Sequence, residues 1–464
     1  MFEDNVRCIG GHYWEMADLL AQGAQQHGYE THIAVNLKWS RRSHGHFHEI
    51  YPVFDVRRMN HWSIGDGGNS TTQRDRRGKP IGATRRERLS QHLRDRLSRA
   101  DRNPAGMLRR WSDSFLRAFK QWQPRQHDHI LINTCDDFVM LALADAIESL
   151  GPIEPLQLSL LFHFPLTISA NNDQPSDRYG RQVLECMDRM HPHRIRLCAT
   201  TDALASQMRA NGLPTSTAPY PTRAGRARSR CSRDLLTSSP SQRLRIVMAG
   251  MPRPEKGRRN LRGLLTKLHS DPTCRNECCI SLQLPTKRWK RLIPSELHSL
   301  IAHQRDPQTT MPGAGSANAA GHFIEVKEDK LSTSAYHDWI DSSDIALFLY
   351  EPERYTARCS GVLLEMMIRG VPVLVPGRCW LADQVAAAGP QQVGMLFDHV
   401  DQVPERLAQI RNRYADFSAG ARQYASNVAK EHSPSRAVHQ LGLREPEPSS
   451  GERFRHEMLK RLAS

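Results

Sequence analysis

Short apolar segments alternate with helical segments through both halves of this sequence, and no other feature restricts the fold as much. An apolar run of roughly four to eight residues predicts a buried strand, and repeated strand–helix units predict a parallel sheet with helices on both faces. Such runs occupy residues 31–36, 129–134, 156–162, 196–201, 243–250, 279–284, 322–326, 344–350, 371–376 and 392–397. The sequence therefore predicts an α/β protein with two tandem Rossmann-like, doubly wound domains.

The domain boundaries follow from length and local composition. A chain of 464 residues exceeds what one hydrophobic core usually organises, which favours two domains. Residues 222–242 are rich in Ser and Arg and lack periodicity, so they are predicted to form the linker. We expect an N-terminal domain at 1–221, a C-terminal domain at 243–430 and a tail or helix at 431–464.

A glycine loop at Gly10 and Gly11 precedes a helical pattern and then a strand-like segment. This order is half of a parallel βαβ unit, in which a buried strand should stand before the loop. Almost no apolar sequence precedes it here. Either the first strand is shortened to a few residues around 5–9, or the chain begins upstream of Met1.

The composition is typical of a soluble protein, and the cysteine pattern does not indicate a metal site. The hydrophobic fraction is 39% and the mean hydropathy is −0.58, and the longest apolar stretches are far shorter than a membrane span. No secretory signal is recognised at the N-terminus, so the expected location is the cytoplasm. Ten cysteines without such a signal predict reduced thiols, and the cluster at 274–279 lacks the spacing of a zinc site. We therefore expect neither a metal nor a cofactor.

Much of the net charge of +15 lies in one region. Between residues 56 and 128 there are 18 Lys or Arg and 7 Asp or Glu, an excess of 11. Residues 57–126 are predicted to be a basic helical insertion, either a solvated face or a patch that associates peripherally with anionic membrane at the inner face. Nucleic acid is the less favoured partner, because the aromatic residues recur at helical spacing and are expected to be buried.

The first candidate site motif lies at 246–268, where a strand is followed by a loop and a helix. The loop carries Gly250, Arg253 and Lys256. Anions bind at the carboxyl ends of parallel strands, where loop amides and helix N-termini are partly positive. Two cations at this position suit a diphosphate, although a basic loop without a ligand has the same composition.

The second motif lies at 335–377, where the loop after a strand leads into a helix. Tyr355 and Arg358 lie in the loop, and Ser360 and Gly361 open the helix, so that backbone N–H groups can face a phosphate. Glu365 lies one turn further along, where it can accept hydrogen bonds from ribose hydroxyls. A carboxylate inside this apolar run needs a partner.

Together these motifs resemble the C-terminal donor domain of the retaining GT-B glycosyltransferases of the group 1, or family 4, class. The resemblance implies two domains facing a cleft and a hexosyltransferase-type enzyme (EC 2.4) of polysaccharide biosynthesis. It implies transfer from a nucleotide-diphosphate sugar, with retention, to a glycan or lipid-linked acceptor. Arg253 and Lys256 become diphosphate contacts, Ser360 and Gly361 the amide cradle, and Glu365 the ribose acceptor.

Two histidines are catalytic candidates on the N-terminal side. His163 follows a strand of the N-terminal domain and is expected to face the cleft, and His12 follows the glycine loop. In the resembled class a histidine in a similar place contacts the donor sugar. A structural role is the alternative for each.

One position departs from the pattern of that class. A second glutamate commonly stands eight residues before the helix glutamate, and here that position is Ala357. Glu351 or Glu353 in the same loop, or Tyr355 and Arg358, are then left to contact the sugar. The alternative is a GT-B-like protein that binds nucleotide sugars without catalysing transfer.

Overall fold

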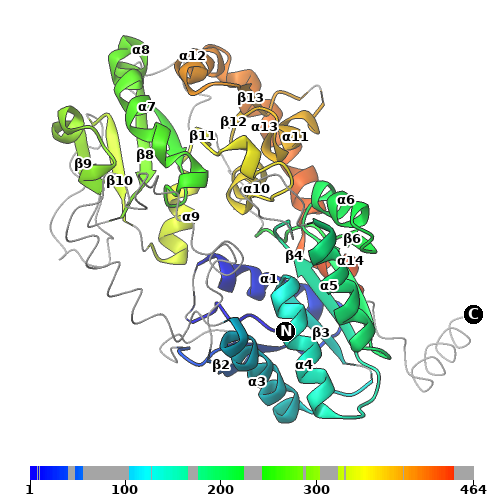
Figure 1. Cartoon of the computed structure of the whole chain (residues 1–464). Coiled ribbons are helices and arrows are strands. Elements are labelled where there is room, and N and C mark those ends of the chain that lie inside the picture. Colours follow the sequence, from blue (N-terminus) through cyan, green and yellow to red (C-terminus); the bar gives the residue numbers. More distant parts are fainter. Residues whose placement is uncertain are drawn as a thin grey trace, which may run out of the picture.

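The computed structural model describes residues 1–7, 9, 11–39, 48–55, 104–126, 128–165, 176–223, 243–285, 289–303, 322–328, 331–389 and 391–443. These residues form two α/β lobes (Figure 1). Within them, no helix is both long and apolar enough to cross a membrane.

The N-terminal lobe is built on parallel strands. They are β1 (His32–Asn36), β2 (Glu49–Phe54), β3 (His129–Cys135), β4 (Gln157–Phe162), β5 (Arg194–Ala199) and β6 (Thr215–Thr217). β1 pairs with β2, and β3 to β6 pair in sequence order, every pair parallel. The sequence did not predict β2 and β6, and the other four lie where the apolar runs predicted them.

Phe2 joins these two groups of strands into one sheet. It forms parallel bridges to Ala34 of β1 and Ile132 of β3, and its N–H donates to the carbonyl of Leu131 at 2.9 Å. The shortened first strand is therefore a single bridge at Phe2, and the prediction that placed it around residues 5–9 was wrong. Bridging both neighbours at this point keeps the peptide groups hydrogen-bonded in the middle of the sheet.

Helices cover both faces of this sheet. They are α1 (His12–Gln26), α3 (Pro104–Trp122), α4 (Asp137–Leu150), α5 (Ser176–Arg189) and α6 (Asp202–Ala210). α3, the described part of the basic stretch, is the crossover helix between β2 and β3, and residues 56–103 lie outside the described part. Its Trp111, Phe115 and Phe119 are at most 2% exposed, as their helical spacing predicted. These rings are therefore not available to stack on nucleic-acid bases.

The C-terminal lobe contains a second parallel sheet. Its strands are β7 (Leu244–Met248), β8 (Cys278–Gln283), β9 (Ile301–His303), β10 (Ile324–Lys327), β11 (Ile345–Leu347), β12 (Val373–Pro376) and β13 (Gly394–Phe397). The order is β13-β12-β11-β7-β8-β10-β9. From β7 the chain adds β8, β9 and β10 on one side, and then returns to add β11, β12 and β13 on the other side of β7. The carboxyl ends of β7 and β11 therefore mark the topological switch point, where doubly wound sheets bind ligands.

The helices of this lobe pack around that sheet, and the last one leaves it. They are α7 (Arg258–Ser270), α8 (Pro272–Glu277), α9 (Thr333–Asp341), α10 (Gly361–Ile368), α11 (Trp380–Ala386), α12 (Val403–Asn412), α13 (Tyr414–Glu431) and α14 (Pro434–Gln440). α14 packs against α1 of the N-terminal lobe. A Cβ on Gly23 would lie 2.4 Å from the Pro434 carbonyl oxygen, so glycine permits this close approach.

Candidate functional site

The loop after β7 begins the site. It passes through Gly250 and Arg253 into a short 3-10 helix, Pro254–Lys256, and reaches α7 at Gly257. Gly257 has φ 75°, and a Cβ there would lie 2.0 Å from the carbonyl oxygen of Leu349, in the segment just after β11. Glycine is thus required for this close contact, which holds the loops of the two switch-point strands against each other.

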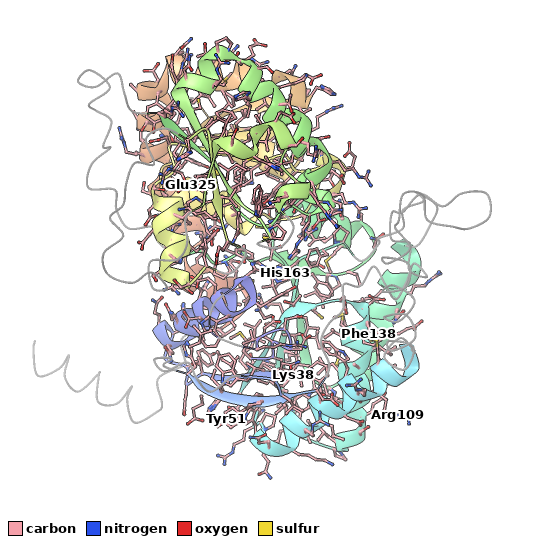
Figure 2. The ribbon with its side chains drawn as sticks, turned by 90° about the vertical axis from the view of Figure 1, so that its left-hand side faces the viewer. Lys38, Tyr51, Arg109, Phe138, His163 and Glu325 are labelled. Atoms are coloured by element: carbon pink, nitrogen blue, oxygen red, sulfur yellow. The ribbon has the colours of Figure 1, made fainter. Side chains whose placement is uncertain are left out.

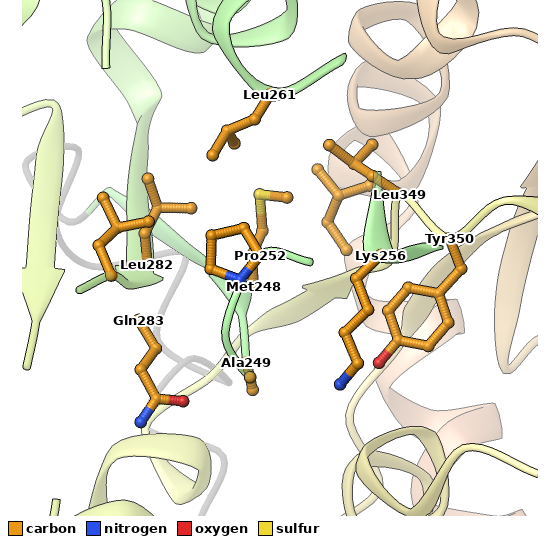
Figure 3. Close-up of a pocket in the computed structure, with 12 residues that line it drawn as sticks. Met248, Ala249, Pro252, Lys256, Leu261, Leu282, Gln283, Leu349 and Tyr350 are labelled. Carbon is orange, nitrogen blue, oxygen red and sulfur yellow. The ribbon is translucent and has the colours of Figure 1, made fainter. Parts of the chain in front are cut away.

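Lys256 lies against the aromatic wall of this switch point. Its Nζ is 5.2 Å from the ring centroid of Tyr350, and Figure 3 shows the two side chains next to each other at the edge of a pocket. The apolar part of that pocket includes Met248, Leu282 and Leu349. Burial, aided by the charges of nearby arginines, lowers the pKa of the Lys256 ammonium. A half-buried cation of this kind gains from an anionic ligand.

The N-terminus of α10 faces the same space. Ser360 is the N-cap, and its Oγ accepts a hydrogen bond from the N–H of Leu363 at 3.3 Å. A Cβ on Gly361 would approach the ring of Tyr220, a residue that follows β6 of the other lobe, to 3.1 Å. The small residue therefore allows α10 to begin directly against the N-terminal lobe, and the backbone N–H groups of its first turn give that end a partial positive charge.

Glu365 has the partner that its sequence context required. The hydroxyl of Tyr336, from α9, donates to Glu365 Oε2 at 2.6 Å. Burial raises the pKa of the Glu365 carboxyl, and the Tyr336 hydrogen bond and the Arg369 charge oppose that rise. The phenol fixes one carboxylate oxygen, so the side chain is held in place for a further donor such as a ribose hydroxyl.

The two candidate histidines meet around Tyr220. The His12 ring stacks on Tyr220 with centroids 5.7 Å apart, and His163 packs edge-on against the same ring at 6.1 Å. The Tyr220 hydroxyl and His12 Nδ1 are 2.8 Å apart. Figure 2 places His163 where the two lobes meet. Tyr220 was missed in the sequence, where only its place after a short strand could have indicated it.

Protonation states follow from these contacts. Part of His12 reaches solvent, yet desolvation in the cleft, and then His163, Lys256, Arg358 and Arg253, lower the pKa of its imidazole. Burial raises the pKa of the Tyr220 phenol well above its usual value. A protonated phenol can donate to Nδ1 of a neutral imidazole, and in that arrangement the ring proton of His12 is on Nε2. His163 Nε2 donates to the carbonyl of Asn133 at 2.8 Å.

The loop before α10 is held from both sides. The hydroxyl of Thr201, in the N-terminal lobe, donates to the carbonyl of Ala357 at 2.7 Å. Tyr355 is 2% exposed and packs at a tilt against Tyr350, with ring centroids 4.5 Å apart, so it lies beneath the site more than it lines it. The Arg358 guanidinium lies over the ring of Phe164 at 4.4 Å. Ala357 stands at the position where the resembled class has a glutamate. It is small and buried, and the hydrogen bond from Thr201 to its carbonyl joins the two lobes.

The glycine loop is described only in part. Gly10 lies outside the described residues. Gly11 is exposed, has φ 81° and stands just before α1, whose first residue is His12. Its positive φ is readily adopted by glycine, and the next residue, His12, contacts Tyr220. The predicted residues that the structure brings around one space are His12, His163, Gly250, Arg253, Lys256, Arg358, Ser360, Gly361 and Glu365.

Comparison with known proteins supports the fold through structure and not through sequence. No protein-family model matches the chain, and no curated protein matches it in sequence. Sucrose-phosphate synthase from Thermosynechococcus elongatus has a similar structure at 11% identity, with 99% of this chain and 96% of that chain covered and a TM-score of 0.55. Alr3699/HepE from Anabaena, in complex with UDP, is similar at 12% identity, 95% and 98% coverage and a TM-score of 0.54.

A third similar structure is trehalose-6-phosphate from E. coli bound with UDP-2-fluoro glucose, at 11% identity, 95% and 98% coverage and a TM-score of 0.55. At such identities the likeness shows the fold. The chain therefore has the GT-B fold, with two Rossmann-like domains, and the predicted fold class is confirmed. Its structural neighbours are GT-B glycosyltransferases.

Proposed function

We propose that this protein is a hexosyltransferase-type glycosyltransferase (EC 2.4) of the group 1, or family 4, class, which uses a nucleotide-diphosphate sugar and retains the anomeric configuration. The observation that carries the proposal is the convergence of two loops at one switch point. The Gly257 contact with Leu349 sets the Arg253 and Lys256 loop beside the segment that leads to α10. Positive groups for a diphosphate and a carboxylate for a ribose thus come from adjacent elements.

The chemistry that these residues support is stabilisation of a departing diphosphate. Lys256, Arg253 and the first amides of α10 supply positive charge where negative charge develops on the leaving group. The β-phosphate itself then accepts the proton of the acceptor hydroxyl. His12 presents a ring N–H and is proposed, with His163, to contact the donor sugar. We propose no metal requirement, and turnover that is unchanged by EDTA is the expected result.

A noncatalytic nucleotide-sugar binder is the second candidate, and Ala357 favours it. The side chain of Ala357 is a buried methyl group, so this position offers no carboxylate to a sugar. The backbone carbonyl of the same residue accepts the hydrogen bond from Thr201. The two candidates differ in product formation. Binding of a nucleotide sugar without transfer or hydrolysis over a panel of glycan and lipid-linked acceptors would favour the binder.

The acceptor side of the proposal includes the membrane. We propose that the protein works in the cytoplasm, at the inner face of the membrane, on a glycan or lipid-linked acceptor. The basic residues at 57–103 are the proposed contact. Co-sedimentation with anionic vesicles should fall when they are deleted. The deletion must stop before α3, because removing that helix would also remove the buried Trp111, Phe115 and Phe119. Equal sedimentation of both proteins would contradict the membrane contact.

The transfer experiment tests the enzymatic proposal. The protein is incubated with UDP-, GDP-, ADP- and TDP-sugars and the acceptor panel, and products are analysed by NMR. The expected result is a product with the anomeric configuration of the donor. A product of inverted configuration would contradict retention, and release of free nucleotide alone would reduce the activity to donor hydrolysis.

A further inference from the structure

Arg358 is a cation of the cleft that the diphosphate does not require. A nucleotide-diphosphate sugar carries one negative charge on each of its two phosphates, and Arg253 and Lys256 match these charges at the end of β7. Arg358 comes instead from the loop before α10. Its guanidinium stacks on Phe164, directly after His163, and so extends toward the N-terminal lobe. It therefore lies on the N-terminal side of the proposed diphosphate site.

The loop that carries Arg358 is fixed in place. The N–H of Trp380 donates to the Tyr355 carbonyl at 2.8 Å, and Thr201 donates to the Ala357 carbonyl. The guanidinium lies 5.2 Å from the Tyr355 ring centroid and 4.4 Å from that of Phe164. Cation–π contacts with two rings restrict the position of the guanidinium and use none of its N–H groups as hydrogen-bond donors.

Several buried or half-buried arginines among the described residues pair with carboxylates. Arg189 pairs with Asp145 and Glu148, Arg223 pairs with Glu15 and Asp18, and Arg369 pairs with Asp341. For Arg358, the described residues include no carboxylate at ion-pair distance. Two acidic groups of this region act on other residues: Glu365 accepts a hydrogen bond from Tyr336, and the charge of Glu255 acts on the pKa values of Lys256 and Tyr355.

We propose that Arg358 binds an anionic group of the substrate in addition to the diphosphate, a carboxylate or phosphate carried by the transferred sugar or by the acceptor. The inference rests on the proposed function. A planar guanidinium forms paired hydrogen bonds with carboxylates and phosphates. These charge-assisted hydrogen bonds are stronger than hydrogen bonds between neutral groups. An acidic sugar thus fits this subsite better than its neutral counterpart.

The test compares sugars that differ only in charge. Calorimetric titrations use UDP-glucose against UDP-glucuronic acid and GDP-mannose against GDP-mannuronic acid. In a second arm, with UDP or GDP saturating, glucose is compared with glucose 6-phosphate and glucuronate. The wild type should prefer the acidic member in at least one arm by about 10- to 100-fold. Arg358→Gln should abolish that preference, because it weakens binding of the acidic member far more than binding of the neutral one.

Arg354→Gln is the matched control. Arg354 is exposed in the same loop and lies 3.7 Å from Glu351, so its replacement should keep the preference. Equal melting temperatures of the wild type and both variants exclude unfolding. The donor arm and the acceptor arm tell the two sources of the anion apart.

Nucleotide binding without any charge preference, or a preference that survives in Arg358→Gln, would overturn this inference and leave the proposed function standing. If the protein binds none of these nucleotides, both this inference and the proposed function are contradicted.

Discussion

The two lobes contribute to the cleft in different ways. In the C-terminal lobe, Arg253, Lys256, Ser360, Gly361 and Glu365 come from two segments at one switch point. In the N-terminal lobe the cleft residues come from separate places: the start of α1, the end of β4, and the segment after β6. A site made of continuous motifs can be recognised in a sequence, whereas a wall assembled from distant segments emerges only in the folded chain.

The largest loss of stability is expected at the contact between Gly257 and Leu349 in the C-terminal lobe. In Gly257→Ala, the new Cβ would meet the Leu349 carbonyl oxygen at 2.0 Å and φ would stay at 75°. Overpacking and left-handed strain together should lower the free energy of unfolding by about 3 kcal/mol. Denaturant titration measures this loss.

Gly212→Ala is the matched variant in the N-terminal lobe. Gly212 has φ 78° but no neighbour within 4 Å of an added Cβ, so strain alone should cost about 1 kcal/mol. Equal losses in the two variants would show that the Leu349 contact does not constrain the loop.

The next effect concerns the charge in that loop. Lys256→Ala should lose roughly 1.5 to 3 kcal/mol of transition-state stabilisation, measured from kcat/KM, because a charge-assisted contact with the leaving group disappears. Lys267→Ala, at the far end of α7 where Lys267 pairs with Asp401, serves as control and should be unaffected. Unchanged turnover in both Lys256→Ala and Glu365→Ala would refute the assignment of the donor site.

A smaller effect separates binding from stability at Glu365. Its carboxyl has a raised pKa in the folded state, so the stability it contributes is full below its unfolded pKa and is lost as pH rises through the folded value. Glu365→Gln should therefore weaken nucleotide binding and yet gain about 1 kcal/mol of stability at pH 7. The gain should vanish at acidic pH. A variant that is less stable at pH 7 would contradict this account.

The smallest effect tests the N-terminal wall. Tyr220→Phe removes the hydroxyl 2.8 Å from His12 Nδ1 and should lower kcat/KM by about 1 kcal/mol, with a changed pH profile as His12 loses its partner. Tyr51→Phe is the control, since the Tyr51 hydroxyl bonds Glu49 on the surface of the same lobe. A purely structural Tyr220 would change stability and leave the pH profile as it was.

Strands that are continuous and apolar could be predicted from the sequence. Strands without a long, uninterrupted apolar run were missed. β2 contains Pro52, which removes a ladder donor and is tolerated because β2 lies at the edge of its sheet. β6 and β9 have only three residues each. Phe2 belongs to the sheet through long-range pairing with β1 and β3, and no local pattern reveals such pairing.

The candidate site divides in the same way. The motifs around Lys256 and Glu365 were predicted because a loop and the helix after it are contiguous in the chain. Tyr336 supports Glu365 from 29 residues away, and Tyr220 meets His12 from 208 residues away. These partners depend on tertiary packing, which places an aromatic residue without requiring any fixed spacing in the sequence.

Titration of nucleoside diphosphates into the protein tests whether the switch point between β7 and β11 binds a donor diphosphate. UDP, GDP, ADP and TDP are titrated into the wild type, Lys256→Ala and the control Lys267→Ala. We expect at least one nucleotide to bind the wild type and Lys267→Ala alike, and to bind Lys256→Ala at least about tenfold more weakly. Binding of none of the four, or equal affinity in all three proteins, would contradict this expectation.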